Sequence, residues 1–505
     1  MFYNRLLPIA IILSGVIAFF YPGNAAARQT IVLGSLGLGY DFWERTYDNE
    51  DDEDLIIDRY EGDRREWAAW PEIELQSLGI HDSLSLRYAP VLRYDDLYDT
   101  TDVDHYLSLV GERFLTRVWS VELTNDFVLS DDPSRYGTPF YSSGLEGEEA
   151  APEEEAPQPQ PTEIEQPPDE ITQNLGRRRF WTNNLILETT YTYAEDSDAG
   201  LGYAYRVLRN DTDDDELGAG YDEYDRHEFF GLWSNRFNPS WRTQLDLNYI
   251  KGLYEDTEDT VPPEIDAPDI PLNLSQDLQE YRADLRLDYD KSVNDIFPLL
   301  YGFSGTQYED LRQDIWVHQL TAGWDHAFDS QTHLIIGAGP SYVNAEELDG
   351  EWGYNAYLNF TRTYQHGDIS ALVNKRYETR NFTGSGDTGL TDLTDVRIDA
   401  TYQFTLDFSS SIFGQYRYED IVDPQGIYYL SALGDSDPLE EQNVGDVTYS
   451  RDSYSAGASL DYTFLRWFVA TVRYEYFQQN GDLIEDSYTD HRVTFLITAS
   501  KELWR

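Results

Sequence analysis

Cysteine is absent from the 505 residues, and lysine occurs only at positions 251, 291, 375 and 501. Without cysteine the chain has no disulfide, no thiolate metal site, no iron–sulfur cluster and no cysteine nucleophile. Basic residues are also scarce, since 36 lysines and arginines face 94 aspartates and glutamates and the formal net charge is −58. This charge excludes a nucleic-acid partner, because phosphate backbones bind basic protein surfaces.

Aromatic residues, by contrast, are abundant. They make up 15% of the chain and include 39 tyrosines. A disordered acidic protein contains few such side chains, because it cannot bury enough apolar surface to fold. The composition therefore predicts a folded chain despite its high charge.

Residues 1–27 have the pattern of a secretory signal peptide. Arg5 is positively charged, the stretch from 6 to 21 is nearly all apolar, and Ala25-Ala26-Ala27 offers a small-residue cleavage site. The apolar run is short for a spanning helix, which needs about 20 residues, so cleavage is favoured over an uncleaved anchor. We expect an exported mature chain that covers residues 28–505, with no transmembrane helix after the signal peptide.

Apolar and polar residues alternate from residue 31 to the end of the chain. The segments 84–94, 281–289, 396–404 and 470–476 are examples. Because side chains alternate across a strand, each segment would have one apolar and one charged face. A soluble β-sandwich alternates in the same way, so alternation alone leaves both architectures open.

We predict about 20 strands, within a range of 18–22, from these segments. They are 31–47, 67–78, 84–95, 103–113, 117–130, 180–194, 200–209, 222–236, 241–254, 278–290, 298–309, 314–327, 333–345, 351–362, 368–379, 391–404, 408–419, 451–464, 468–479 and 490–504.

Loop lengths distinguish a membrane barrel from a soluble sandwich. Connections after even-numbered strands are short, whereas most connections after odd-numbered strands are long and acidic; the exceptions are 96–102, 310–313 and 346–350. Outer-membrane barrels have short periplasmic turns and long extracellular loops, and only a closed barrel satisfies the backbone of strands in lipid. The sequence therefore predicts an all-β, antiparallel up-and-down transmembrane barrel in the outer membrane of a Gram-negative cell.

Aromatic residues near the strand ends fit the two girdles of such a barrel. They are Trp43, Tyr47, Trp70, Tyr94, Trp119, Tyr249, Tyr254, Trp352, Tyr416, Tyr418 and Tyr476. Pro90 and Pro340 fall inside predicted strands, where the missing N–H removes a ladder bond, so they predict bulges or a shifted register. Trp504 is penultimate, whereas such barrels usually end on the aromatic residue itself.

Three features resemble one family of bacterial proteins. They are the opening GSLGLGYDFWERTYD (34–48), the aromatic and charged strand ends, and the closing SYTDHRVTFLITAS (487–500). They are similar to the porin-like outer-membrane barrels encoded beside exopolysaccharide loci, sometimes called "beta-barrel porin 2". The resemblance implies a role in exopolysaccharide export or its surface machinery, which would make periplasmic export components candidate partners, and it supplies no catalytic motif.

The charged faces of the predicted strands are candidates for the lining of the lumen. The candidates are Arg87, Arg93, Arg206, Arg282, Asp284, Arg286, Asp288, Arg397, Asp399, Arg417, Arg473 and Glu475. Together they would create a transverse field that orients a polar or anionic solute such as a sugar acid. Alternatively, each arginine braces the wall by pairing with an acid, and this is the favoured role for any single residue.

Acidic loops are the second candidate region. From Glu146 to Glu170 the loop 131–179 contains ten acids and no base, so we expect it to be disordered; the alternative is a polyanionic flap over the pore mouth. The neighbouring Arg177-Arg178-Arg179 would pair with lipopolysaccharide phosphates or offset the local charge.

Alternating acids in two further loops suit Ca²⁺ in spacing. They are Asp48, Glu50, Asp52 and Asp54 in one loop, and Asp211, Asp213 and Asp215 in the other. The glycine of an EF-hand is replaced in these loops by Glu53 and Glu216. We expect weak association of divalent cations, with no specific metal site and no cofactor.

No motif marks an active site. The eight histidines form no zinc-protease pattern, although His326 and His333 flank one predicted turn. Gly34, Gly37 and Gly39 lie in a strand that no helix follows, so the context of a phosphate-binding loop is missing. We therefore expect a protein that is not an enzyme, and a rim hydrolase is the less favoured alternative.

The sequence thus predicts a porin-like channel in contact with the lipid bilayer and lipopolysaccharide. Its cargo would be polysaccharide or another polar solute, and nucleic acid is excluded. The alternative is a scaffold barrel whose lumen is plugged, for which the loop 255–277 with Pro262-Pro263 is the candidate plug.

Overall fold

The computed structural model describes residues 28–47, 63–131, 179–210, 223–254, 277–309, 314–345, 348–382, 389–423, 447–481 and 487–504. The predicted signal peptide, the acids at 48–54 and 211–215, the flap between residues 131 and 179, and all of the candidate plug 255–277 except Asp277 lie outside these residues. Those expectations stay predictions.

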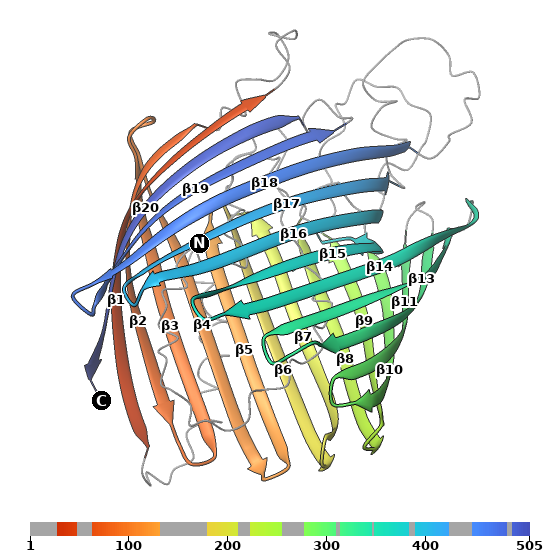
Figure 1. The fold of residues 1–505 in the computed structure, drawn as a ribbon. Coiled ribbons are helices and arrows are strands. Elements are labelled where there is room, and N and C mark those ends of the chain that lie inside the picture. The colour runs from red at the N-terminus through yellow and green to blue at the C-terminus, as the bar shows by residue number, and fades with distance from the viewer. Residues whose placement is uncertain are drawn as a thin grey trace, which may run out of the picture.

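Twenty strands form one sheet (Figure 1). They are β1 (Gln29–Tyr47), β2 (Arg64–Leu78), β3 (Asp82–Asp95), β4 (Thr100–Thr116), β5 (Trp119–Ser130), β6 (Phe180–Ala194), β7 (Ser197–Asn210), β8 (Tyr224–Asn238), β9 (Trp241–Tyr254), β10 (Leu278–Ser292), β11 (Asp295–Tyr308), β12 (Ile315–Ala327), β13 (Thr332–Ala345), β14 (Leu348–Tyr364), β15 (Gly367–Arg380), β16 (Gly389–Thr405), β17 (Phe408–Asp423), β18 (Val447–Phe464), β19 (Phe468–Gly481) and β20 (Tyr488–Trp504). Each predicted strand is present.

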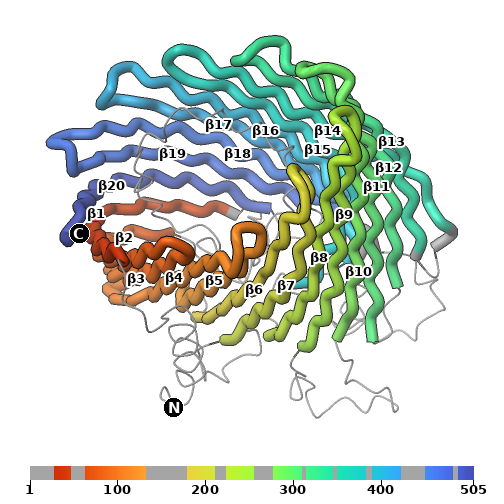
Figure 2. The backbone as a smooth tube through the Cα atoms, turned by 90° about the horizontal axis from the view of Figure 1, so that it is seen from below, coloured from red at the N-terminus to blue at the C-terminus, as the bar shows by residue number. Residues whose placement is uncertain are grey.

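The sheet closes on itself. Every strand is antiparallel to its neighbours in sequence, and β1 also pairs with β20 from Val32↔Trp504 to Tyr47↔Tyr488. Figure 2 shows the resulting ring, with the first and last strands side by side. Closure gives the outermost strands partners, which a sheet in lipid requires. In the described part of the chain, no helix is long and apolar enough to cross a membrane.

The two ends of the barrel differ in their connections. Each even-numbered strand up to β18 is joined to the next by a turn of two to four residues, from 79–81 to 465–467. We call this the turn end, and the opposite end the loop end. Asp196, Leu465 and Arg466 adopt positive φ in these turns, as tight hairpins require. Gln29 and Trp504 also lie toward the turn end, because Gln29 pairs with Leu78 and Trp504 with Val32.

Apolar side chains face outward along the strands. On β1, Leu36 and Leu38 are 49% and 54% exposed, whereas Gly37 and Asp41 on the other face are buried. Exposed aromatic rings gather near both ends, with Trp119, Trp241 and Trp467 toward the turn end and Trp67, Tyr94 and Trp352 toward the loop end. An apolar exterior between aromatic girdles is the surface that a bilayer requires.

Three aromatic residues expected in the girdles face the inside instead. Trp70 is 1% exposed and packs over Gly37, and Trp43 lies beneath the guanidinium of Arg64. Tyr254 stacks on Phe382 in an internal cluster. The prediction was wrong for these residues because proximity to a strand end does not decide which face a side chain occupies.

Tyrosine–histidine pairs repeat on the outer face near the loop end. The hydroxyls of Tyr88, Tyr203, Tyr301 and Tyr474 lie 2.8 to 3.0 Å from Nδ1 of His105, His227, His318 and His491. Each tyrosine is on an odd-numbered strand, and its histidine is two residues from the directly opposite position on the next strand. The four pairs therefore share one diagonal geometry.

The strand prolines cause neither a bulge nor a register shift. Pro71 and Pro90 lie opposite each other, in a short interruption of the β2–β3 ladder between Ala69↔Leu92 and Ile73↔Tyr88, and the register is the same on both sides. The two prolines, which have no N–H to donate, therefore lie in the same unpaired stretch of the β2–β3 ladder. Pro340 likewise falls in a gap between Gln319↔Ser341 and Ala322↔Ala338. The expected bulge or register error was wrong.

Candidate functional site in the barrel lumen

The charged residues predicted from alternation lie on the face of the strands opposite the exposed leucines and tyrosines. This inner face includes Arg87, Arg93, Arg206, Arg282, Asp284, Arg286, Asp288, Arg397, Asp399, Arg417, Arg473 and Glu475. On β10, for example, Arg286 points inward between the outward Leu285 and Leu287. Their part in conducting a solute remains a prediction.

Several inward arginines pair with an acid two residues away on the same strand. The distances are 2.7 Å for Arg282–Glu280, 2.8 Å for Arg286–Asp288, 2.8 Å for Arg397–Asp399 and 2.7 Å for Arg417–Glu419. Residues i and i+2 share one face of a strand, so each pair lies flat along the wall. These contacts match the bracing role, and they also leave a lining of alternating charge.

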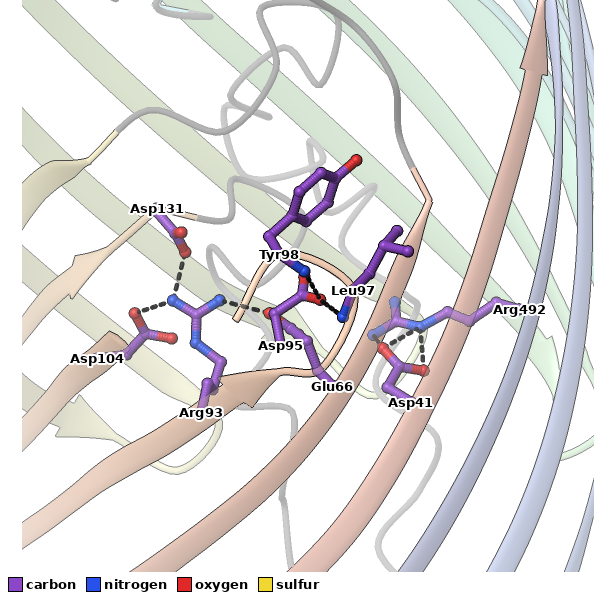
Figure 3. Close-up of polar contacts among 9 residues, drawn as sticks. All are labelled: Asp41, Glu66, Arg93, Asp95, Leu97, Tyr98, Asp104, Asp131 and Arg492. Atoms are coloured by element: carbon purple, nitrogen blue, oxygen red, sulfur yellow. Dashed lines mark hydrogen bonds and ion pairs between the residues drawn. The ribbon is translucent and has the colours of Figure 1, made fainter. Parts of the chain in front are cut away.

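Arg93 sits at the centre of a buried charge cluster on β2–β5 (Figure 3). Its guanidinium lies 3.2 Å from Glu66 and 2.7 Å from Asp104, and it also contacts Asp131. Nearby, Asp95 accepts hydrogen bonds from the backbone N–H groups of Leu97 and Tyr98. The cluster therefore joins β2, β3 and β4 to the residue that follows β5, while Asp95 fixes the 96–99 turn at the loop end.

A second ion pair crosses the junction of the first and last strands (Figure 3). Arg492 of β20 lies 2.7 Å from Asp41 of β1, and Thr494 donates to the same carboxylate. Arg45 and Asp490 form a further pair at 2.7 Å across the same junction. Inward side chains thus reinforce the closure of the barrel.

Carboxylates dominate the inner face of β2–β6, which we call the acidic wall. Its acids are Glu66, Glu72, Glu74, Asp95, Asp102, Asp104, Glu112, Glu122, Asp126 and Glu188, against Arg64, Arg87 and Arg93. Glu112, Glu122 and Glu188 form a direct cross-strand row toward the turn end. Like charges directly opposite each other destabilise a sheet. The three adjacent carboxylates also concentrate negative potential on this part of the lumen.

Arginines gather on the inner face of β15–β18, which we call the arginine arc. Arg376 and Arg380 lie 2.8 and 3.0 Å from Glu378, and Arg380 also lies 2.6 Å from Glu419. Arg417 is 2.7 Å and Arg451 is 3.8 Å from that same Glu419. Four guanidinium groups thus surround two carboxylates, which gives a local excess of positive charge around Glu378 and Glu419, although Asp395, Asp399 and Asp461 lie on the same inner face.

The chain folds into the lumen where β15 ends, and we call residues 381–382 the latch. The Asn381 side chain donates to Glu280 at 2.5 Å and accepts from the Tyr308 hydroxyl at 2.8 Å. Its backbone carbonyl accepts from the Tyr254 hydroxyl. These contacts tie the end of β15 to β9–β11, several strands away around the ring.

Phe382 fills an apolar cluster inside the barrel. It is 1% exposed, stacks on Tyr254, meets Tyr224 edge-on, and lies under the Arg226 guanidinium, which is 4.9 Å from its ring centre. The cluster also contains Phe180, Leu208, Ile250, Leu278, Tyr308, Ile315, Val317, Val343 and Leu390. The latch therefore narrows the loop end of the lumen. Sequence analysis missed it, because alternation predicts strands and gives no signal for the path of a loop.

The histidines noted at the predicted turn do not converge. His326 lies 2.8 Å from Asp295, and His333 lies 2.5 Å from Asp325. Among the described residues, no group of three or more His, Cys, Asp or Glu could hold a metal ion.

Comparison with known proteins supports the fold. No protein-family model and no curated protein matches the chain. Among solved structures, a mutant of the Pseudomonas aeruginosa ferric enterobactin receptor PfeA is similar with a TM-score of 0.50 at 9% identity, over 94% of this chain and 81% of that one. Acinetobacter baumannii OccAB3 gives 0.43 at 9% identity, over 93% and 99%. Pseudomonas aeruginosa OpdL gives 0.38 at 9% identity, over 94% and 99%.

These similarities are of fold, and they do not show a link to an exopolysaccharide locus. A closed antiparallel barrel with an apolar exterior, aromatic girdles and a charged interior is typical of proteins that span the outer membrane. The protein is a 20-stranded β-barrel of the outer membrane.

Proposed function

We propose that the barrel is a porin-like channel for polar solutes. This proposal rests on the charged side chains that line the inner face along the length of the barrel. They extend from the glutamate row near the turn end to the arginine arc near the loop end. A barrel of 20 strands is wide enough for a lumen that side chains alone do not fill. The latch narrows that lumen, so it would set an upper limit on solute size.

We further propose that the solute is a polysaccharide. Inward arginines and acids alternate along β10, and the same chemistry continues on β9, where Arg242 lies 3.3 Å from Asp288. Guanidinium and carboxylate groups at regular spacing offer donors and acceptors to successive sugar hydroxyls. The sequence resemblance to barrels of exopolysaccharide loci supports the same cargo.

Swelling of proteoliposomes in sugar solutions tests both proposals. Vesicles with the folded barrel should swell in small neutral sugars, and the rate should fall as sugar size increases. Arg286→Ala should change these rates, whereas its outward neighbour in Leu285→Ala should not, because only Arg286 faces the lumen. Failure of the folded barrel to pass any sugar would overturn the channel and favour a plugged scaffold. Passage of small sugars but no acidic oligosaccharide would overturn only the polysaccharide proposal.

A further inference from the structure

The ladder between β14 and β15 stops early. These neighbours in the wall (Figure 1) pair from Tyr364↔Gly367 near the turn end only as far as Ala356↔Lys375. Toward the loop end, β14 continues on β13 to Leu348, and β15 continues on β16 to Arg380. The two strands therefore part, and no other described strand pairs with either edge beyond this point. We call this parting the seam.

Contacts inside the barrel hold the seam apart. The Gln319 side chain of β12 donates a hydrogen bond of 3.0 Å to the Tyr377 carbonyl of β15. The Tyr377 ring covers Gly353 of β14 so closely that an added Cβ would lie 2.5 Å from its hydroxyl. Beyond Tyr377, the latch anchors the end of β15 on β9–β11. The end of β15 thus crosses the inner face instead of continuing along β14.

The outer side of the seam lies at the membrane interface. Trp352 and Tyr354 stand on the outer face of the β14 edge and are 75% and 61% exposed. Trp352 continues the cross-strand row of His318 and Tyr342, which belongs to the loop-end girdle. Such rings occupy the headgroup region, where water and polar headgroups can satisfy an edge that hydrocarbon could not. The β14 edge of the seam therefore faces the headgroups.

Both chemistries of an amphipathic molecule meet at the seam. On its inner side, Tyr377 packs against the apolar cluster that includes Ile315, Val317 and Val343. At its closed end, Lys375 and Asp392 form a 2.5 Å ion pair, and the Lys375 ammonium lies 5.3 Å from the Tyr354 ring centre. Apolar side chains on the inner side and aromatic side chains on the outer side thus flank the seam, with a charged pair at its closed end.

We propose that the seam is a lateral portal, through which amphipathic solutes with a polar head and an apolar tail pass between the lumen and the headgroup region. The apolar cluster would accept the tail while the charged lumen accepts the head. The portal goes beyond axial passage of polar solutes, and the two can be tested independently.

Covalent stapling of the seam provides the test, because the chain contains no native cysteine. Gly353→Cys with Tyr377→Cys, joined by a short bifunctional thiol reagent, bridges β14 and β15. Ala338→Cys with Ala356→Cys is the matched control, since these residues lie directly opposite each other where the β13–β14 ladder is intact, beside the closed end of the seam. Folding of both variants is checked before and after stapling by resistance of the barrel to denaturation in detergent without heating.

The probe is a fluorescent alkyl glycoside loaded inside proteoliposomes and extracted from their outer leaflet by albumin, which is too large to enter the barrel. The seam staple should reduce transfer to the rate of protein-free vesicles, whereas the control staple should leave it at the rate of the unstapled protein. Sugar-driven swelling should be unchanged by the seam staple. Equal transfer by the two stapled proteins, or no transfer by the unstapled barrel, would overturn the portal. Transfer without any swelling would overturn the polar channel and leave the portal intact.

Discussion

The side-chain amide of Asn381 donates a 2.5 Å hydrogen bond to Glu280, although 101 residues separate them in sequence. Asn381 follows β15 directly, whereas Glu280 lies on the inner wall of β10. The bond therefore shows that the chain enters the lumen after β15. The adjacent Phe382 packs against β8 and β9 through Tyr224 and Tyr254, so the latch occupies space that a solute would otherwise use.

Removal of the latch ring should widen the lumen. Phe382→Ala is expected to raise the single-channel conductance, because the benzyl group is buried within the lumen and nothing of similar size replaces it. Phe229→Ala is the matched control, since this ring is 55% exposed on the outer face. Unchanged conductance in Phe382→Ala, with the control also unchanged, would show that the latch does not constrict the pore.

The glutamate row of the acidic wall should make the channel prefer cations. Neutralising it with Glu112→Gln, Glu122→Gln and Glu188→Gln together is expected to shift the reversal potential in a salt gradient toward zero, because a charged lining concentrates counterions. Glu44→Gln removes an exposed carboxylate on the opposite, outer face of β1 and should leave the potential unaltered. A potential that is insensitive to the triple substitution would contradict this assignment.

The free energy of unfolding should depend strongly on Arg93, the central cation of its buried charge cluster. Arg93→Met leaves the carboxylates of Glu66 and Asp104 buried without that partner, and breaking such a pair costs about 3–5 kcal/mol. Arg397→Met removes a pair whose arginine is 45% exposed, and such exposed pairs contribute about 0–1 kcal/mol. Urea unfolding of the barrel in lipid vesicles measures both. Equal losses in the two variants would mean that burial does not govern these pairs.

Close contacts between glycines and inward aromatic rings should also matter for stability. A Cβ added at Gly202 would lie 2.1 Å from the Phe230 ring, so Gly202→Ala is expected to cost roughly 1–3 kcal/mol by overpacking. Gly414→Ala is the matched control, because nothing lies within 4 Å of its added Cβ. The same unfolding assay compares them, and a Gly202→Ala variant as stable as Gly414→Ala would show that the ring moves aside without cost.

Much of the fold follows from the sequence, because alternation and loop length both reflect the bilayer. Arg286 and Leu285 point to opposite faces for the same reason that their sequence alternates. The latch and the seam did not follow, because they depend on long-range contacts such as Asn381 with Glu280 and Gln319 with Tyr377. Pairing each strand with its neighbour along its full length is the default expectation, and β15 departs from it only near its end.

If the barrel is a channel, solutes cross the outer membrane through this lumen. Single-channel recording of the folded barrel in a planar bilayer tests it most directly, with folding verified beforehand in detergent. An open lumen should give discrete conductance steps, and these steps should be larger in Phe382→Ala. A folded barrel that stays electrically silent, both as wild type and as Phe382→Ala, would contradict it.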